Sequence, residues 1–180
     1  MSNLIERARP IRLVIFDVDG VLTEGRLSYS SHPDAPDKEE NKVFHVRDGL
    51  GMKLLMQAGL EIGIITARSS LAVARRMADL GVPHVYQGQL DKRAGYEHLR
   101  AQLKLAHEQV AYMGDDIIDL PVLRRVGLAA TVSDATPFMQ SHCHWVAQQR
   151  GGLGAARELC EFILSAQGRW EETLAYYLRE

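Results

Sequence analysis

The stretch Phe16-Asp-Val-Asp-Gly-Val-Leu-Thr23 begins at the end of the apolar run Leu13–Phe16 and decides the fold of this chain. The run has the length and composition of a short buried strand. Asp17 and Asp19 therefore follow a strand directly and precede a glycine. Two like charges this close to a buried strand repel each other and lose hydration unless a cation or a shared proton compensates them. The octet indicates a polar site at the end of the first strand.

Short apolar runs alternate with helix-like segments along the rest of the chain. This alternation predicts a parallel sheet with helices on both faces, and near-continuous apolar strands fit a sheet that is covered on both sides. The expected strands are Leu13–Phe16, Ile62–Ile65, Val85–Gln87, Val110–Met113 and Leu128–Val132. The expected helices are Gly51–Ala58, Leu71–Leu80, Arg93–Lys104, Leu120–Val126, Pro137–Gln140 and Leu153–Ala166. The predicted fold class is α/β, a Rossmann-like, three-layer, doubly wound parallel sheet.

Two segments lie outside this alternation. In residues 24–46, called the excursion below, Arg26–Ser30 and Lys42–Val46 can pair as a β-hairpin around a polar tip, His32–Asn41. Residues 168–180 form a polar C-terminal tail that includes aromatic side chains. No linker, repeat or low-complexity tract divides the 180 residues, so we expect one domain over residues 1–180.

Charge and hydropathy exclude several classes of protein. The formal net charge of −2 shows no excess of basic residues of the kind that binds nucleic acid. The apolar runs are far shorter than the roughly 20 residues of a membrane helix, and Met1–Pro10 lacks the apolar core of a signal peptide. Cys143 and Cys160 show no metal-ligand spacing, which is typical of reduced thiols. We therefore expect a cytoplasmic protein with no nucleic-acid or membrane partner.

Polar residues follow several expected strands at the point where each strand ends. Asp17 and Asp19 follow the first strand, Thr66 follows the second, and Asp115 and Asp116 follow the fourth. The carboxyl ends of parallel strands share one edge of the sheet, where ligands of such folds bind. We therefore expect these side chains to converge on one rim.

The residue types on this rim suit the hydrolysis of a phosphate monoester. One carboxylate can attack phosphorus, and a second can give a proton to the leaving alkoxide and later take one from water. Carboxylates also bind Mg²⁺, which retains several waters. Asp17, Asp19 and Asp115 meet these needs. Thr66 offers a hydroxyl donor, and Lys92 offers a positive charge that can hold both the nucleophile and the phosphate.

Four motifs, in this order, resemble those of the haloacid dehalogenase superfamily. They are Asp17-Val-Asp19-Gly-Val-Leu-Thr23, Ile64-Ile-Thr66-Ala-Arg68, Lys92 and Gly114-Asp115-Asp116-Ile-Ile-Asp119. The resemblance implies that Asp17 is the nucleophile and Asp19 the general acid and base. It implies Mg²⁺ held by Asp17, the backbone carbonyl of Asp19 and Asp115. It also implies that Thr66 and Lys92 hold the phosphate. A halide leaves without a proton, so Asp19 favours a phosphatase or phosphotransferase over a dehalogenase.

Further segments resemble the capless 3-deoxy-D-manno-octulosonate 8-phosphate phosphatases, over about Ile11 to Gly168. These segments are Phe44–Gly49, Tyr86–Gly88, Gly114–Pro121 and Gly151–Glu158. The resemblance implies a fold without a cap domain and a sugar-acid phosphate substrate of lipopolysaccharide synthesis. It also implies a homotetramer in which a neighbouring subunit helps to close each site. The implied substrate-binding residues are Asp19, Val46, Arg47, Asp48, Gly49, Lys53, Arg68, Arg76 and Lys92.

Two other functions stay open. His45 and Lys53 stand where this group is expected to have asparagine and arginine, which leaves a nine-carbon keto-deoxy sugar phosphate as an alternative substrate. A non-catalytic regulatory or assembly module with the same fold is a third hypothesis. The intact set of catalytic residue types argues against that module.

Some of these residues also have a structural interpretation. Thr66 can cap the segment that follows it. Asp119 can cap the helix that begins at Leu120, with Pro121 in its first turn. Alternatively, it can orient the residues that bind the metal and the phosphate. Gly151-Gly152 can form a phosphate loop or the glycine-rich start of a helix beside the site.

Overall fold

A computed structural model describes residues 2–28, 41–175 and 177–179. Within these residues, a single parallel sheet has the strand order β3-β2-β1-β4-β5-β6. Its strands are β1 Leu13–Phe16, β2 Glu61–Ile65, β3 His84–Tyr86, β4 Val110–Met113, β5 Leu128–Thr131 and β6 Trp145–Val146. The chain crosses outward from β1 to β3 and then returns to β4, so the strand order reverses beside β1. A crevice at such a reversal is where α/β sheets bind ligands.

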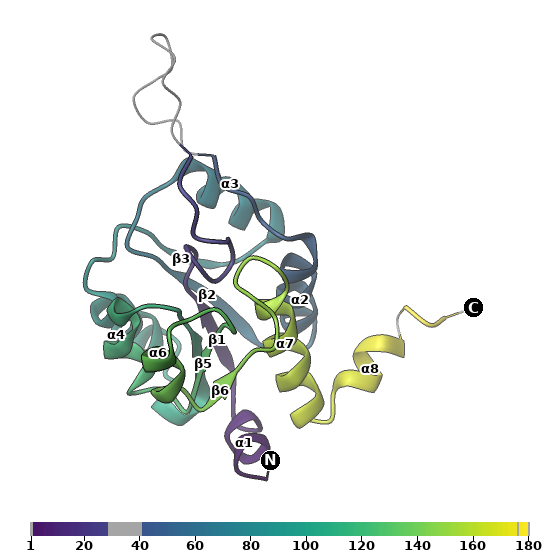
Figure 1. Ribbon diagram of the computed structural model, residues 1–180. Coiled ribbons are helices and arrows are strands. Elements are labelled where there is room, and N and C mark those ends of the chain that lie inside the picture. The colour runs from purple at the N-terminus through teal and green to yellow at the C-terminus, as the bar shows by residue number, and fades with distance from the viewer. Residues whose placement is uncertain (1, 29–40, 176, 180) are drawn as a thin grey trace.

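Helices cover both faces of the sheet (Figure 1). They are α1 Ser2–Ala8, α2 Val46–Gln57, α3 Leu71–Leu80, α4 Lys92–Gln102, α5 Leu120–Leu123, α6 Pro137–Ser141, α7 Ala155–Ala166 and α8 Trp170–Ala175. Two single 3₁₀ turns are η1 His107–Gln109 and η2 Ile117–Asp119. On one face α2 packs against α7 and α3, and on the other α4 packs against α5. The predicted three-layer, doubly wound architecture is confirmed.

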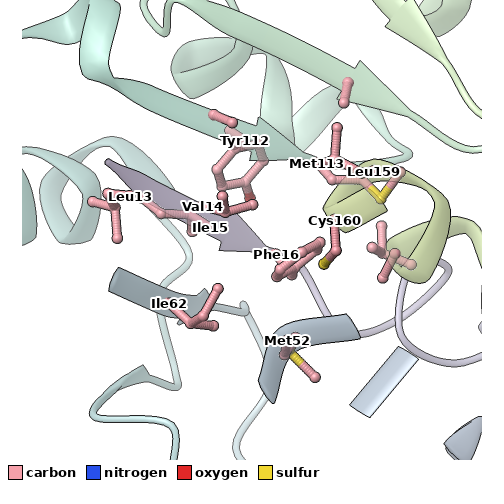
Figure 2. Close-up of a cluster of buried hydrophobic side chains, with 14 of the residues drawn as sticks. Leu13, Val14, Ile15, Phe16, Met52, Ile62, Tyr112, Met113, Leu159 and Cys160 are labelled. Atoms are coloured by element: carbon pink, nitrogen blue, oxygen red, sulfur yellow. The ribbon is translucent and has the colours of Figure 1, made fainter. Parts of the chain in front are cut away.

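The core lies around β1, which pairs with β2 on one side and β4 on the other. Phe16 stands opposite Ile64 and Met113, so β1 and β4 end at the same level and β2 ends one residue later. Figure 2 shows Phe16 near Met52 of α2 and Cys160 of α7, which belong to the helical layer on one face of the sheet. Each large apolar side chain buried here contributes about 1.5–3 kcal/mol. The packing therefore fixes the strand ends from which the acidic residues emerge.

Helix α2 begins at Val46, five residues before the predicted start at Gly51. His45 has extended backbone angles, and its side chain accepts a hydrogen bond from the Arg47 amide, as an N-cap does. The glycines of this helix weaken the helical pattern of its sequence, but they let α7 approach closely. A Cβ atom on Gly51 would lie 3.0 Å from the Cα atom of Arg157.

The excursion has no strand in its described parts, residues 24–28 and 41–45. Its predicted tip, apart from residue 41, lies outside the described residues, so the β-hairpin stays a prediction. The described residues contain no cap domain over the carboxyl edge of the sheet. None of the described helices has the length and apolar composition that crossing a bilayer requires.

Candidate active site

The acidic residues lie where the sheet's hydrogen-bond ladder ends. The Asp17 amide donates to the Met113 carbonyl at 3.0 Å, which extends the pairing of β1 with β4 by one residue. On the other side of β1, the Thr66 amide donates to the Tyr86 carbonyl at 3.0 Å. Asp115 follows β4 by two residues. The structure thus brings the predicted residues to one edge of the sheet.

Residues 17–23, called the acidic turn below, fold tightly around one carbonyl. The amides of Leu22 and Thr23 donate to the Val18 carbonyl at 2.9 and 3.0 Å, and the Thr23 hydroxyl donates to it at 3.3 Å. Gly20 has a positive φ of 86°, which side chains disfavour. A Cβ atom there would lie 2.0 Å from Asp115 Oδ2. Only glycine therefore lets the Asp115 carboxylate pack against this turn.

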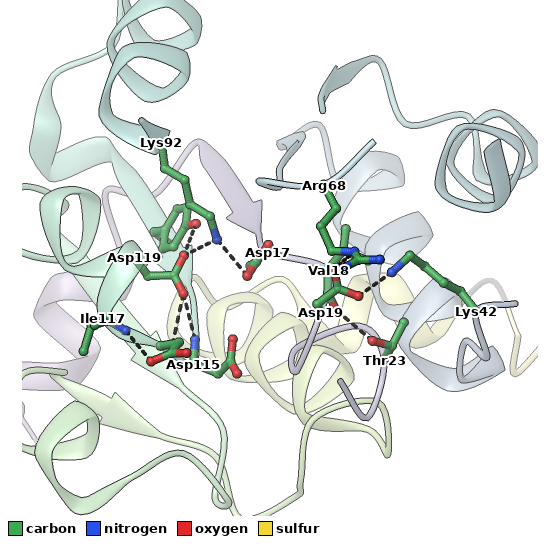
Figure 3. A network of polar contacts seen from close by, with 12 residues as sticks. Asp17, Val18, Asp19, Thr23, Lys42, Arg68, Lys92, Asp115, Ile117 and Asp119 are labelled. Atoms are coloured by element: carbon green, nitrogen blue, oxygen red, sulfur yellow. Dashed lines mark hydrogen bonds and ion pairs between the residues drawn. The ribbon is translucent and has the colours of Figure 1, made fainter. Parts of the chain in front are cut away.

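A buried network joins Asp17 to residues 115–119, the acidic segment that follows β4 (Figure 3). Lys92 Nζ lies 2.7 Å from Asp17 Oδ2 and 2.6 Å from Asp119 Oδ1, and the Tyr112 hydroxyl donates to the same Asp119 oxygen at 2.6 Å. The Lys92 side chain is 0% exposed. Its ammonium is therefore compensated almost entirely by two carboxylates.

Asp119 is the hub of this network. Its Oδ2 atom accepts hydrogen bonds from the amides of Asp115 and Asp116, at 3.0 and 3.2 Å. Although Asp119 occupies the N-cap position of α5, its side chain makes no capping hydrogen bond. The capping hypothesis is therefore wrong, and Asp119 acts behind the site by fixing Lys92 and the loop that carries Asp115. Asp116 is a cap instead, because its Oδ1 atom accepts from the Ile117 amide at 2.7 Å.

Burial dominates the electrostatics of this network. Burial, together with the charge of Asp119, raises the pKa of Asp17 to about 6, although Lys92 opposes the shift. Burial and the charges of Asp119 and Asp17 raise the pKa of Asp115 to about 8. Burial alone would lower the pKa of Lys92, but the two carboxylates outweigh it and raise that pKa above its ordinary value. The site holds more negative charge than its lysine compensates.

The excess negative charge and the free carboxylate oxygens fit a divalent cation. Carboxylate oxygens of Asp17, Asp115 and Asp119 lie within 4.8 Å of one another. The oxygens of Asp119 are already engaged by Lys92, Tyr112 and two amides. Asp17 Oδ1 is buried and has no hydrogen-bond donor among the described residues. Asp17 and Asp115 are therefore the side chains that remain to hold a hard cation such as Mg²⁺.

The Asp19 side chain lies on the other, more open side of the site (Figure 3). Lys42 Nζ contacts Asp19 Oδ1, and Arg68 Nε lies 3.8 Å from Asp19 Oδ2. The Asp19 side chain is 26% exposed, whereas that of Lys42 is 3% exposed. The predicted residue Arg68 thus meets Asp19. Lys42 was not among the predicted residues, since a single lysine inside the polar excursion has no spacing signal.

Four of the remaining predicted residues are one buried side chain and three exposed ones. Thr66 is buried, and it caps no helix, because α3 begins at Leu71 and Ser70 occupies its N-cap. Val46, Arg47 and Lys53 are exposed, and no hydrogen bond or ion pair between described residues joins them to the network.

Asp48 and Gly49 are buried, and each packs against a later part of the chain. Asp48 is 2% exposed, and its Oδ1 atom accepts from the Arg157 amide at 2.8 Å, which ties α2 to the first turn of α7. A Cβ atom on Gly49 would lie 2.4 Å from Arg76 Nη2, so the predicted residue Arg76 lies against this glycine. Within the described residues, Asp48 therefore supports the fold around the proposed sugar site.

Residues 148–154, called the glycine loop below, buttress the acidic turn. The Gly152 amide donates to the Val21 carbonyl at 2.8 Å, and a Cβ atom on Gly151 would lie 1.8 Å from the Gly20 carbonyl oxygen. Glu158 accepts from the amides at the start of the loop, residues 148 and 149. The Gly152 amide thus holds the acidic turn and is already engaged by a protein carbonyl.

Comparison with known proteins agrees with this geometry. Residues 79–159 match the model of a family described as haloacid dehalogenase-like hydrolase. The chain is 45% identical over 170 residues to the 3-deoxy-D-manno-octulosonate 8-phosphate phosphatase of Yersinia pestis, covering 94% of this chain and 88% of that protein. It is 42% identical over 171 residues to the phosphatase of that name from Escherichia coli K12, covering 95% and 88%.

Solved structures extend the likeness to three dimensions. The Yersinia pestis phosphatase superposes with a TM-score of 0.89 at 44% identity, covering 94% of this chain and 89% of that one. The Moraxella catarrhalis phosphatase, in complex with a magnesium ion, a phosphate ion and KDO, superposes with a TM-score of 0.92 at 37% identity, covering 98% and 99%. The chain therefore belongs to the 3-deoxy-D-manno-octulosonate 8-phosphate phosphatases, within the haloacid dehalogenase-like hydrolases.

Proposed function

We propose that this chain is a Mg²⁺-dependent phosphatase that hydrolyses 3-deoxy-D-manno-octulosonate 8-phosphate to the free sugar acid and phosphate, in lipopolysaccharide biosynthesis. The observation that carries the proposal is that two carboxylates only two residues apart in the sequence lie on opposite sides of the site. Asp17 is buried beside Lys92, and Asp19 is held apart at the open side. Relatives that carry this phosphatase name, at 42–45% identity over most of the chain, support the substrate.

Asp17 is placed to act as the nucleophile. Lys92 anchors one carboxylate oxygen at 2.7 Å, which restricts the rotation of the side chain. Attack forms a bond between an Asp17 oxygen and phosphorus while the bond from phosphorus to the sugar oxygen breaks. With a pKa near 6, the Asp17 carboxylate is mostly ionised at neutral pH. Lys92 and Thr66 are the proposed partners of the phosphoryl oxygens.

Asp19 supplies the proton transfers. It gives its proton to the leaving alkoxide and then takes one from the water that attacks the aspartyl-phosphate. This second step releases phosphate and regenerates Asp17. Partial exposure lets Asp19 exchange protons with solvent between turnovers. A positioned acid or base of this kind contributes about 10²–10⁴-fold in rate.

Asp17, Asp115 and the backbone carbonyl of Asp19 would hold Mg²⁺. When bound, the ion supplies charge neutralisation for the phosphoryl oxygens. The side chain of Asp19 is engaged by Lys42 on the open side, which is compatible with a ligand role for its carbonyl alone.

We further infer that the sugar acid contacts Val46, Arg47, Gly49, Lys53, Arg68 and Arg76, and that the protein is a cytoplasmic homotetramer with one domain per chain. Large, strongly exposed apolar side chains support an assembly. Val43 is 79% exposed, Val46 76% and Leu90 86%. A neighbouring subunit that covers them would help to close the site. A light-scattering mass equal to that of a monomer, at working concentration, would contradict this assembly.

The test is phosphate release from the eight-carbon and nine-carbon keto-sugar phosphates, with Mg²⁺ present or chelated. We expect Mg²⁺-dependent turnover that favours the eight-carbon substrate. Asp17→Asn removes the nucleophile and should lower turnover by at least about 10³-fold without unfolding the protein. Asp116→Asn is the matched control, because Asp116 is exposed and caps η2. Retained hydrolysis in Asp17→Asn would contradict the mechanism. Hydrolysis of neither sugar phosphate would favour a non-catalytic module.

A further inference from the structure

Lys42 is unusual among the lysines of this chain. Its side chain is 3% exposed although it belongs to the excursion, outside any helix or strand. A buried ammonium is costly unless an anion and hydrogen bonds compensate it. Its Nζ atom meets that need at Asp19 Oδ1. Among the described residues, Lys92 is the other lysine with a buried side chain, and it holds Asp17. Each catalytic carboxylate thus has a buried lysine of its own.

The two lysines restrain their carboxylates in different ways. Lys92 is itself fixed by Asp119, so Asp17 belongs to a wholly buried network. Asp19 stands one residue before Gly20, on a turn where its side chain has several rotamers available. Arg68 approaches the other Asp19 oxygen only to 3.8 Å, which is too long for a hydrogen bond. Among the described residues, Lys42 therefore makes the close contact that selects one Asp19 orientation.

We infer that Lys42 is a positioning residue for proton transfer: its ammonium holds the Asp19 carboxylate in the orientation from which Asp19 reaches the leaving oxygen. This inference rests on the proposed function. Proton transfer requires heavy atoms within about 2.6–3.2 Å, so loss of the preferred rotamer removes most of the benefit of the acid. Lys42 acts through Asp19 and does not itself contact phosphorus.

The inference has a chemical signature. A sugar alkoxide is a poor leaving group and needs the proton from Asp19. A p-nitrophenolate ion leaves readily without protonation. Hydrolysis of the aspartyl-phosphate uses Asp19 whichever substrate formed it, so the two substrates differ only in the first step, which kcat/KM reports. Damage that acts through Asp19 should therefore lower kcat/KM for the sugar phosphate and leave kcat/KM for p-nitrophenyl phosphate nearly unchanged. Damage to the nucleophile or the metal site should appear with both substrates.

The experiment combines Lys42→Met, Lys42→Arg and Asp19→Asn with a double variant, each assayed on both substrates with Mg²⁺. Methionine keeps a similar unbranched chain and removes the charge. Lys42→Met should lower kcat for the sugar phosphate by about 10- to 100-fold, with KM changed no more than about twofold. The loss in kcat/KM with p-nitrophenyl phosphate should stay within about threefold. Lys42→Arg should recover part of the loss, and adding Lys42→Met to Asp19→Asn should cost little more. Lys104→Met, at an exposed lysine after α4, is the control.

Three results would overturn the inference alone. They are equal losses of kcat/KM on the two substrates, losses that multiply in the double variant, and a raised KM with unchanged kcat. The last would make Lys42 a substrate-binding residue. Circular dichroism and the unfolding midpoint of each variant separate these results from simple misfolding. A wild-type chain that hydrolyses neither compound would instead contradict the proposed function, and the inference with it.

Discussion

The carboxylate of Asp17 lies on the buried side of the site, whereas that of Asp19, two residues further along, lies on the open side. The Asp17 side chain is 5% exposed and that of Asp19 is 26% exposed. Lys92, which holds Asp17, stands at the start of a helix and is tied to Asp119. Lys42, which holds Asp19, comes from the excursion, outside any described element.

This difference matches the two chemical tasks that we propose for Asp17 and Asp19. A nucleophile gains from being fixed, because attack on phosphorus needs a narrow range of distance and angle. An acid and base must exchange a proton with solvent once in each cycle, so it needs access as well as orientation. The buried side therefore depends on the fold of the whole sheet, and the open side depends on the local course of the excursion.

The largest effect should come from breaking the buried side. Lys92→Met leaves the carboxylates of Asp17 and Asp119 close together without their cation. We expect the free energy of unfolding to fall by about 3–5 kcal/mol and turnover to fall by at least about 10³-fold. Urea unfolding and phosphate release measure the two effects. Lys42→Met should destabilise the protein less, because Asp19 is a quarter exposed and can be hydrated. Equal destabilisation by the two variants would contradict the comparison.

An intermediate effect should come from pH and metal acting on the buried side. The pKa of Asp17 is raised to about 6 and that of Asp115 to about 8, from an ordinary value of 3.8. A raised pKa stabilises the folded state below pH 4 and loses that contribution as pH rises through the folded pKa. The metal-free protein should therefore melt several degrees lower at pH 8.5 than at pH 5.5.

Mg²⁺ should offset this loss, because it favours the charged carboxylates. The shift in melting temperature on adding Mg²⁺ should grow as pH rises from 5.5 to 8.5. Thermal melts in Mg²⁺ and in chelator test this expectation, with Asp115→Asn as the variant in which the pH dependence flattens. A metal-induced shift that is the same at every pH would contradict the assigned ligands.

The smallest effect should come from the open side, at the start of α2. His45→Asn exchanges one N-cap for a better one, and we expect the free energy of unfolding to rise by about 0.5 kcal/mol or less. His45→Ala, the matched variant, should lower it by about 1 kcal/mol because the Arg47 amide loses its acceptor. Chemical denaturation resolves the pair. A larger loss in His45→Asn than in His45→Ala would show that the ring has a role beyond capping.

The fold and the central residues of the site can be predicted from the sequence. The predicted bounds of β1, β4 and α3 match the structure, because buried parallel strands and amphipathic helices have strong local patterns. The start of α2 was missed, since glycines in its first turns read as helix breakers. The two-residue strand β6 and the short helix α1 were also missed, because neither is long enough to show a period.

Side-chain partnerships were the part that sequence could not supply. Asp119 meets Lys92 across 27 residues, and Lys42 meets Asp19 across 23. No periodicity links such positions, so the sequence pattern does not indicate Lys42. It also leaves the hub role of Asp119 as one interpretation among several. Asp48, a predicted substrate residue, also contacts an amide 109 residues away. Charges whose partners are distant in sequence need the folded structure to be assigned.

The contact between the glycine loop and the acidic turn bears on the order in which the enzyme is made. The turn leaves the ribosome early, but the backbone that supports it at Gly151 and Gly152 follows about 130 residues later. A nascent chain that stops before this loop carries every proposed catalytic side chain and lacks the support that shapes the turn. Phosphatase activity should therefore arise late in translation, once residue 152 of 180 has emerged.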